Sequence, residues 1–561
     1  MVIIKYLFNF IRGVFMNKEK RTFNNPILSG FYPDPSICRV NDDYYMITSS
    51  FSYFPGIPIF HSKDLVNWEQ IGHVLDRPSQ LNLDGVGISC GIFAPTIRYN
   101  NGVFYVITTN IGNGGNFIVT STNPYGPWSD PYWIDDTPGI DPSLFFDDDN
   151  KVYYIGTAKA IDAAYDYDNE IYCQELDLNS MKLVGKRFGL WRGALKNAHC
   201  PEGPHLYKIN NYYYLMIAEG GTEHFHAVTI ARSKNISGPY EGYSGNPILT
   251  HRHLGKEYPI SNVGHADLIE TQNGEWYLVF LGSRPYGGYY KNLGRETFLA
   301  PVKWEDNWPI VSPGTGKAEF EYPVPNLPYF KVEPLPTRDD FNSDTLSFIW
   351  NCIRTPREKF YSLTDRPSYL RLKLTPKRIV DIIDYTSINS RYDLNKTPSF
   401  IGRRQQHINF NTIVKMEFNP LNEFETAGLA LIQNNNFQYR LEYSLLDSKK
   451  VIRLMKCISK PSMNYTDNSK YDNIENQIIQ KEFDSDILYL KICALGQDYS
   501  FYYGDSLDNM QLLIENVDGR ILSTDIAGGF VGTYIGMFAS SNFKESTNVA
   551  DFDWFDYSEL K

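Results

Sequence analysis

Short apolar runs broken by turn residues make up most of the chain. Between Asn25 and Pro325, Gly, Pro, Asn and Asp interrupt these runs every few residues, and almost no stretch keeps the 3.6-residue period of an amphipathic helix. After a proline-rich passage from Tyr322 to Pro336, short alternating runs resume and continue to the C-terminal end. Alternation bounded by turn residues is typical of strands. We therefore expect an all-β protein.

One pattern recurs five times in the first half of the chain. Each copy has an opening residue, an apolar run, a turn, and an aromatic pair ten to thirteen residues after the opening. The openings are Asp34, Ala94, Asp141, Glu202 and His265. Their spacing of roughly 45 to 65 residues is typical of propellers in which each repeat is a four-stranded sheet. The repeat predicts a five-bladed β-propeller, with the openings facing one another at one end of its axis.

The proline-rich passage predicts the boundary between two domains, because closely spaced prolines cannot feed a central strand. We expect an N-terminal extension over residues 1–22, the propeller over 23–325 and a C-terminal β-sandwich, jelly-roll-like, over 326–561. The sandwich is expected because alternating runs continue there without the five openings.

The first fifteen residues are mildly apolar, but Lys5 and Arg12 interrupt them and no small-residue cleavage site follows. No signal peptide is expected, and Met16 is an alternative start to Met1.

Charge and cysteine content narrow the function classes. The net charge of −12 argues against nucleic acid or an anionic membrane as partner, since both need clustered Lys and Arg. No apolar run reaches the ~18 residues of a membrane span. Seven dispersed cysteines form no metal-binding spacing and indicate reduced thiols in the cytoplasm. Aromatic residues make up 15% of the chain, which suits strands and sugar-stacking surfaces.

Three of the five openings are carboxylates, and two interpretations of them are open. Asp34 and Asp141 each precede a proline, where an aspartate commonly caps a turn. Glu202, the opening residue of the fourth copy, is a third carboxylate at the equivalent position, and this favours a chemical role for all three. Glycosidic cleavage needs one carboxylic acid to protonate the leaving oxygen and one carboxylate to activate water or attack carbon. A third acidic group can raise the pKa of the acid, because like charges disfavour joint ionisation.

The motifs around these residues resemble those of a known family. The passages NPILSGFYPDPSICR, GIDPSLFFDDD, HCPEGPHLYK, GHADLIE and LGRETFLAPV are similar to passages of glycoside hydrolase family 43, in particular its two-domain β-xylosidases. The similarity runs from about Asn25 to the end of the chain, including DDFNSDTLSFIWNCIRTP. The resemblance implies a five-bladed propeller with a C-terminal β-sandwich and an inverting hydrolysis. By motif it implies that Asp34 is the general base, Asp141 the pKa-modulating and orienting aspartate, and Glu202 the general acid.

The resemblance also implies residues that bind the sugar. Arg295 matches an arginine that holds sugar hydroxyls, and Phe51 and Phe93 match the aromatic walls on which a sugar face packs. Phe93 departs from the tryptophan that the family often has there, which predicts a looser subsite, although Phe93 could simply fill the core. A loop of the sandwich is expected to close the pocket with Phe530.

His265 has two open interpretations: a hydrogen-bonded core residue or, as the resemblance to the family implies, a channel residue that binds substrate and touches a calcium ion. Imidazole is an unusual partner for calcium, so water would supply most ligands. No cofactor is otherwise required.

We expect an exo-acting enzyme that releases xylose from the non-reducing end of β-1,4-xylo-oligosaccharides. An α-L-arabinofuranosidase or a bifunctional enzyme acting on arabinosides is the alternative activity. A non-catalytic carbohydrate-binding propeller is the alternative from another class, although a binding module does not need the intact carboxylate trio. The resemblance further implies a homo-oligomer.

Overall fold

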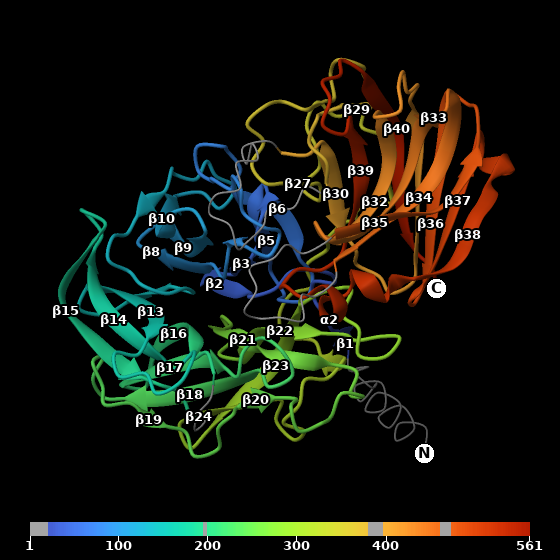
Figure 1. The fold of residues 1–561 in the computed structure, drawn as a ribbon. Helices are drawn as coiled ribbons and strands as arrows, with labels where there is room; N and C mark the ends of the chain where they lie inside the picture. Colours follow the sequence, from blue (N-terminus) through green and yellow to red (C-terminus); the bar gives the residue numbers. More distant parts are fainter. Residues whose placement is uncertain (1–20, 195–198, 380–396, 460–472) are drawn as a thin grey trace, which may run out of the picture.

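The computed structural model describes residues 21–194, 199–379, 397–459 and 473–561, and nearly all of its regular elements are strands (Figure 1). Within these ranges the helical elements are two short 3₁₀ helices, η1 (Leu507–Asn509) and η2 (Gly519–Leu522), and one turn of α-helix, α2 (Thr524–Ala527). The prediction of an all-β protein is confirmed. Since α2 has four residues, no helix in these ranges could reach across a membrane. The two alternative starts, Met1 and Met16, lie outside the described residues.

Residues 36–311 form five antiparallel sheets, each built from one continuous stretch of chain. The first sheet contains β2 (Ser36–Val40), β3 (Asp43–Ile47), β5 (Gly56–Ser62) and β6 (Glu69–Leu75). The second contains β7 (Gly91–Ile92), β8 (Thr96–Asn100), β9 (Val103–Ile111), β10 (Gly115–Ser121) and β11 (Tyr132–Trp133). The third contains β12 (Ser143–Phe146), β13 (Val152–Lys159), β14 (Asn169–Asp177) and β15 (Lys182–Trp191).

The two remaining sheets of this region follow the same plan. The fourth contains β16 (Glu202–Ile209), β17 (Tyr212–Glu219), β18 (Ala227–Ser233), β19 (Glu241–Gly242) and β20 (Leu249–Thr250). The fifth contains β21 (Ser261–Glu270), β22 (Trp276–Ser283), β23 (Glu296–Glu305) and β24 (Trp308–Val311). Neighbouring sheets share buried apolar clusters; for example, Ile107 of the second sheet and Tyr154 of the third belong to one cluster. Such burial is the main favourable contribution to folding.

The five predicted openings lie at equivalent places in the five sheets. Asp34, Ala94 and Asp141 stand two residues before β2, β8 and β12, respectively. Glu202 begins β16, and His265 lies within β21 at a bulge in its pairing with β22. The strands β2, β8, β12, β16 and β21 contact one another in this order, and β21 also contacts β2. The repeat in the sequence thus marks a closed series of neighbouring strands.

A buried carboxylate joins four of these strands. Asp267 in β21 has a fully buried side chain, which accepts hydrogen bonds from the hydroxyl of Ser36 in β2 at 2.8 Å and the hydroxyl of Tyr207 in β16 at 2.6 Å. The guanidinium of Arg98 in β8 lies 2.8 Å from the same carboxylate. Burial alone would raise the pKa of Asp267, but these partners hold it far below its usual range. A buried charge persists in a fold only when it is paired in this way.

The C-terminal region contains two larger sheets. The eight-stranded sheet contains β26 (Arg338–Asp339), β28 (Tyr361–Ser362), β29 (Leu370–Lys373), β31 (Phe410–Glu417), β36 (Ile487–Leu495), β37 (Asp498–Gly504), β38 (Gln511–Asp518) and β40 (Val549–Glu559). The six-stranded sheet contains β30 (Phe400–Arg404), β32 (Thr426–Asn434), β33 (Phe437–Leu446), β34 (Lys449–Ser459), β35 (Asn473–Glu482) and β39 (Tyr534–Ser540). Residues of both sheets form one large apolar core, and β31 buries every second residue, as a strand with one face on a core must. The arrangement agrees with the expected β-sandwich.

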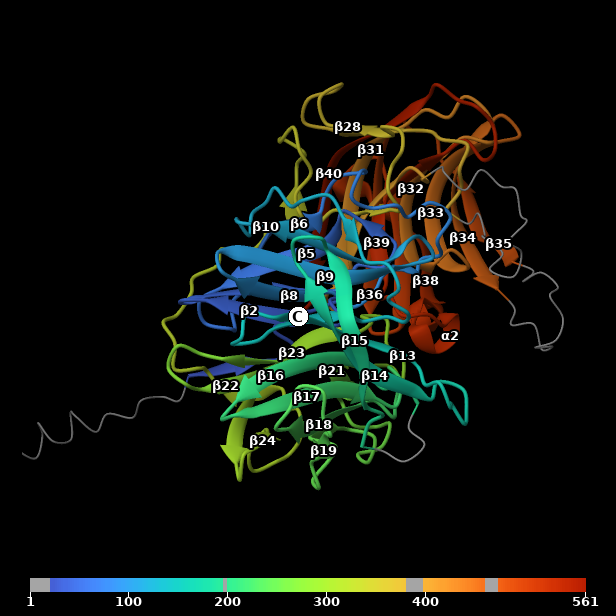
Figure 2. The same ribbon diagram turned by 90° about the vertical axis from the view of Figure 1, so that its left-hand side faces the viewer.

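Two short pairings join distant parts of the chain. β1 (Thr22–Asn24) pairs with β25 (Glu321–Pro323), so Thr22, the last residue of the predicted extension, is already in a strand. β4 (Tyr53–Phe54) pairs with β27 (Cys352–Ile353) and so links the first half of the chain to the C-terminal region. Stacked tyrosine rings, Tyr53 and Tyr534, reinforce this link with centroids 3.7 Å apart. The C-terminal region therefore packs directly beside the five-sheet region (Figures 1 and 2).

Candidate active site

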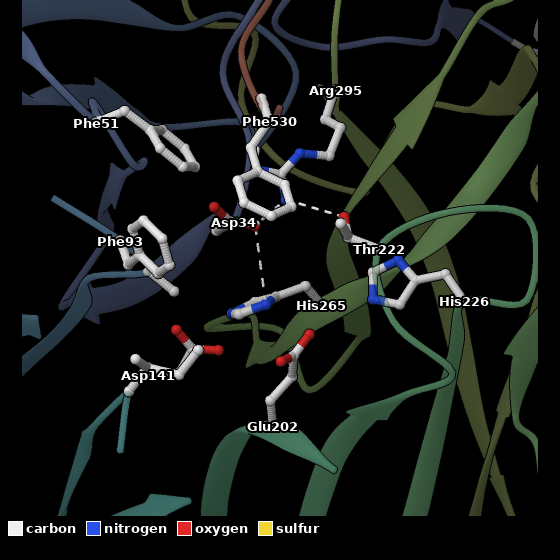
Figure 3. A pocket seen from close by; sticks show the side chains of 12 residues that line it. Asp34, Phe51, Phe93, Asp141, Glu202, Thr222, His226, His265, Arg295 and Phe530 are labelled. Carbon is white, nitrogen blue, oxygen red and sulfur yellow. Dashed lines mark hydrogen bonds and ion pairs between the residues drawn. The ribbon is translucent and has the colours of Figure 1, made fainter. Parts of the chain in front are cut away.

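One pocket, about 450 Å³ including the space open to solvent, collects the five opening residues, further residues of the five-sheet region and Phe530 of the C-terminal region (Figure 3). All eight site residues predicted from the sequence line it, together with four others. The twelve lining residues are Asp34, Phe51, Phe93, Ala94, Ile140, Asp141, Glu202, Thr222, His226, His265, Arg295 and Phe530.

Asp34 is buried in this pocket and surrounded by groups that favour its ionised form. One carboxylate oxygen accepts a hydrogen bond from the hydroxyl of Ser49 at 2.6 Å, and the other lies 2.8 Å from Arg295 Nη1 and 3.8 Å from His265 Nδ1. Burial raises the pKa of Asp34, but Arg295, His265 and Ser49 together bring it below its ordinary value. Asp34 is therefore a carboxylate across the neutral range.

Asp141 and Glu202 have the opposite electrostatics. Burial, followed by the charge of Asp34, raises the pKa of Glu202 to about 7. Burial and the negative charges of Glu202 and Asp34 raise the pKa of Asp141 well above its usual value. Two neighbouring carboxyl groups in a buried site resist joint ionisation, so the pair holds a proton near neutral pH. The pocket thus offers one ionised carboxylate and one proton-bearing carboxyl pair, which is what acid–base cleavage of a glycosidic bond requires.

Several site residues occupy backbone conformations that side chains rarely adopt. The φ angles are 55° at Asp34, 54° at Asp141, 50° at Phe51 and 44° at His265. Non-glycine residues with such angles persist where the surrounding structure fixes them, and they concentrate at functional sites. Asp34, Asp141 and His265, three of the five openings, line the pocket from this left-handed conformation.

His265 lies between the carboxylates and against a glycine. The φ of Gly203 is 56°, and a Cβ at that position would stand 2.8 Å from the imidazole, so no other residue fits without displacing the ring. Burial lowers the pKa of His265, and the charge of Asp34 offsets only part of this shift. The net lowering favours the neutral imidazole.

The expected calcium ion has few protein ligands at this position. In the described ranges, no three His, Cys, Asp or Glu side chains are grouped as a metal site. Calcium prefers several oxygen ligands, and His265 offers a single ring nitrogen. A calcium ion held mainly by water, with His265 beside it, stays a prediction, and no step below passes through a metal.

Three phenylalanines form the apolar wall of the pocket. The ring centroid of Phe51 lies 5.2 Å from that of Phe93 and 6.1 Å from that of Phe530. The predicted loop of the C-terminal region supplies Phe530, whose side chain remains partly exposed beside the two buried or half-buried rings. Aromatic faces of this kind pack against the C–H face of a sugar.

Two polar residues of the pocket were not predicted from the sequence. The hydroxyl of Thr222 accepts a hydrogen bond from Arg295 Nη1 at 3.1 Å. The ring of His226 is buried, and its Nδ1 lies 3.0 Å from the backbone oxygen of Asn262. A carbonyl oxygen can only accept, so Nδ1 carries the proton and donates it to this bond. The other ring nitrogen, Nε2, has no partner among the described residues. Burial lowers the pKa of His226 to about 3, so the ring is neutral and Nε2 can accept a hydrogen bond. The only sequence signal was the polar segment GGTEHFH between two strands.

Ala94 and Ile140 complete the lining as small and apolar contacts. Ala94 is the one opening without a polar side chain, and it was predicted only as a member of the repeat.

Comparison with protein families matches both halves of the chain. Residues 23–309 match glycosyl hydrolases family 43, and residues 338–558 match the beta xylosidase C-terminal concanavalin A-like domain. A xylosidase/arabinosidase of Butyrivibrio fibrisolvens is 47% identical over 542 residues, which cover 96% of this chain and 99% of the relative. A non-reducing end alpha-L-arabinofuranosidase of Bacteroides ovatus is 40% identical and covers 96% of this chain and 95% of its own length.

Solved structures agree with these relatives. The crystal structure of a xylan beta-1,4-xylosidase from Bacillus halodurans has a TM-score of 0.86 and 34% identity, and the match covers 96% of this chain and all of that one. The matched range 23–309 contains Asp34, Asp141 and Glu202, the three carboxyl residues that line the pocket. The chain is therefore a glycosidase and belongs to glycoside hydrolase family 43.

Proposed function

We propose that the protein is an inverting, exo-acting glycosidase that releases xylose from the non-reducing end of β-1,4-xylo-oligosaccharides. The observation that carries the proposal is the electrostatic contrast within one pocket. The pKa of Asp34 is lowered, whereas that of Glu202 is raised to about 7. A base and an acid on the two sides of one sugar must differ in this way.

In the proposed reaction, Asp34 takes a proton from a water molecule as the water oxygen attacks the anomeric carbon. Glu202 donates its proton to the glycosidic oxygen as the bond between that oxygen and the anomeric carbon breaks. Asp141 shares the proton with Glu202 and orients the sugar. For inversion, the carboxyl groups of Asp34 and Glu202 should stand roughly 6.5 to 9.5 Å apart, which stays a prediction.

The binding groups have separate tasks in this proposal. Arg295 holds Asp34 and the sugar hydroxyls near it, and Thr222 and His226 provide further polar contacts. Phe51, Phe93 and Phe530 pack on the sugar. Because Phe530 comes from the C-terminal region and stands across from the five-sheet region, the pocket admits a chain end rather than the middle of a polysaccharide.

We also infer that the five sheets are the blades of a five-bladed propeller. The closed order of contacts among β2, β8, β12, β16 and β21 supports this inference. In such an arrangement, the first strand of each blade lines the central channel, and the opening residues meet at its end.

The second candidate is α-L-arabinofuranosidase activity, alone or beside xylosidase activity. The names of the two relatives above favour it, since one is a xylosidase/arabinosidase and the other an arabinofuranosidase. The ring of Phe93 is smaller than the tryptophan that the family often has at this position, and it therefore leaves room for a differently shaped sugar. A purely carbohydrate-binding role, in contrast, would leave the carboxylate trio without a purpose.

Kinetics on 4-nitrophenyl β-D-xyloside and 4-nitrophenyl α-L-arabinofuranoside separate the two activities. The proposal expects the higher kcat/KM on the xyloside, and a large preference for the arabinoside would overturn it. Proton NMR of 4-nitrophenyl β-D-xyloside hydrolysis, which releases a single sugar, should show α-xylose as the first product, since inversion changes the anomeric configuration. If β-xylose appears first, the enzyme retains configuration.

Location in the cytoplasm and assembly as a homo-oligomer remain predictions. We propose the first from the dispersed cysteines and the second from the resemblance to the family alone, and sedimentation velocity of the purified protein tests the second. A single species at the mass of one chain would contradict it.

A further inference from the structure

A buried lysine lies just outside the pocket. The side chain of Lys291 is only 2% exposed, and its ammonium contacts the carboxylate of Asp525 and lies 3.5 Å from that of Glu223. The backbone N–H of Lys291 also donates to Asp525 at 2.9 Å. The ring of Tyr289 stands beside the ammonium, with its centroid 4.1 Å away. A charge removed from water needs such partners, and the arrangement supplies both carboxylate and aromatic ones.

The ammonium joins three segments that line the pocket. Glu223 directly follows Thr222, Lys291 precedes Arg295 by four residues, and Asp525 precedes Phe530 by five. The first two segments belong to the five-sheet region, whereas the third belongs to the C-terminal region. The contact between Lys291 and Asp525 is therefore a charged link between the two regions, next to the site.

The segment from Asp525 to Phe530 is anchored at both ends. α2 ends at Ala527, and two glycines with φ of 70° and 79° lead to Phe530. The backbone N–H of Phe530 donates to the hydroxyl of Ser89 at 3.0 Å, and its carbonyl accepts from Arg295 Nη2 at 3.3 Å. Phe530 is 39% exposed, so burial fixes its place only in part. The position of this wall depends on the backbone anchors.

We propose that Lys291 and Asp525 form a latch that holds Phe530 over the sugar. The latch consists of these two positioning residues, which act on substrate affinity through Phe530. The inference rests on the proposed exo-glycosidase site. Because Phe530 packs on the sugar alike in the ground state and the transition state, loosening it should raise KM and leave kcat nearly unchanged.

The test is a double-mutant cycle with xylobiose as substrate. Asp525→Ala keeps a good helix former in α2 and removes both contacts to Lys291. It should raise KM by about 5-fold or more and change kcat by less than about 2-fold. Phe530→Ala alone should raise KM at least as much. Asp525→Ala added to Phe530→Ala should then change KM no further, since the latch would have no wall to hold.

The matched control is Arg357→Gln. Arg357 forms another ion pair between the two regions, with Asp84 at 3.0 Å, but it has no contact with the segment that carries Phe530. This variant should keep the wild-type KM. If Asp525→Ala leaves KM unchanged, or raises it equally in the Phe530→Ala background, the latch does not exist.

Asp525→Ala leaves Lys291 buried with a weaker partner, which can prevent folding. In that case Asp525→Ala with Lys291→Met removes both charges and replaces the lysine by an apolar side chain of similar length. The same rise in KM, abolished in the Phe530→Ala background, is expected, and a wild-type KM overturns the proposal. The wild-type turnover of xylosides and arabinosides tests the proposed function separately, because the latch predicts only the ratio of variant to wild type.

Discussion

Replacement of Glu202 by alanine tests the proton donor directly. The pocket raises the pKa of this carboxyl from 4.5 to about 7. At pH 7 about half of the enzyme molecules therefore carry the proton, whereas a glutamate with the ordinary pKa would carry it in about 0.3% of them. The pocket increases the supply of acid more than ~100-fold at that pH. Glu202→Ala removes this supply altogether.

The loss should depend on the leaving group, because a good leaving group needs little protonation. On xylobiose we expect kcat to fall by about 10²- to 10⁴-fold, the usual contribution of general acid catalysis. On 2,4-dinitrophenyl xyloside, whose leaving group departs as a stable anion, the loss should be about 10-fold or less. Asp34→Ala is the matched comparison, since a missing base should reduce turnover of both substrates alike.

The pH profile gives a second readout of the same group. In the wild type, kcat/KM on xylobiose should fall about tenfold per pH unit above about 7, as Glu202 loses its proton. Glu202→Ala should lack this alkaline limb. Equal losses on the two substrates, or an alkaline limb that survives the substitution, would refute the assignment of Glu202 as the acid.

Three further substitutions probe the surroundings. Arg295→Gln removes the cation that lowers the pKa of Asp34, so that pKa should rise and the acid limb of kcat/KM should move to higher pH; an unmoved limb contradicts the pairing. Asp267→Asn leaves Arg98 buried without its ion pair and should lower the free energy of unfolding by about 3–5 kcal/mol in denaturant titration, whereas a loss below about 1 kcal/mol would show that the joint between the sheets is dispensable. His226→Phe removes the Nε2 acceptor together with the Nδ1–H bond to Asn262, so it should lower kcat/KM by about 2- to 12-fold and also lower the melting temperature, and equal kinetics would mean that Nε2 does not bind the sugar.

The opening residues of the five copies could be predicted to share one site, because equivalent positions of repeated sheets meet in space. Asp34, Asp141, Glu202 and His265 all line the pocket for this reason. The all-β class followed from the alternating runs, and the resemblance to the family supplied Arg295 and the aromatic walls.

Other parts of the site depend on contacts between distant segments. Thr222 and His226 lie between the second and third strands of their sheet, outside the repeated column, so the repeat gave no reason to select them. Lys291 and Asp525 are 234 residues apart in the chain and meet only because two regions pack together. The alternation of each strand specifies which face is buried but not which partner covers it.

The guanidinium of Arg295 has two partners with different tasks. One Nη lies on the carboxylate of Asp34, and the other on the backbone oxygen of Phe530. Binding equilibria that share a group are linked reciprocally, so a ligand that favours the proton on Asp34 must also alter the energy of seating Phe530. A bulky inhibitor that pushes the C-terminal segment outward should accordingly bind with a different affinity on the two sides of the Asp34 titration. The shift in the pKa of Asp34 and the change in inhibitor affinity should then report the same coupling free energy.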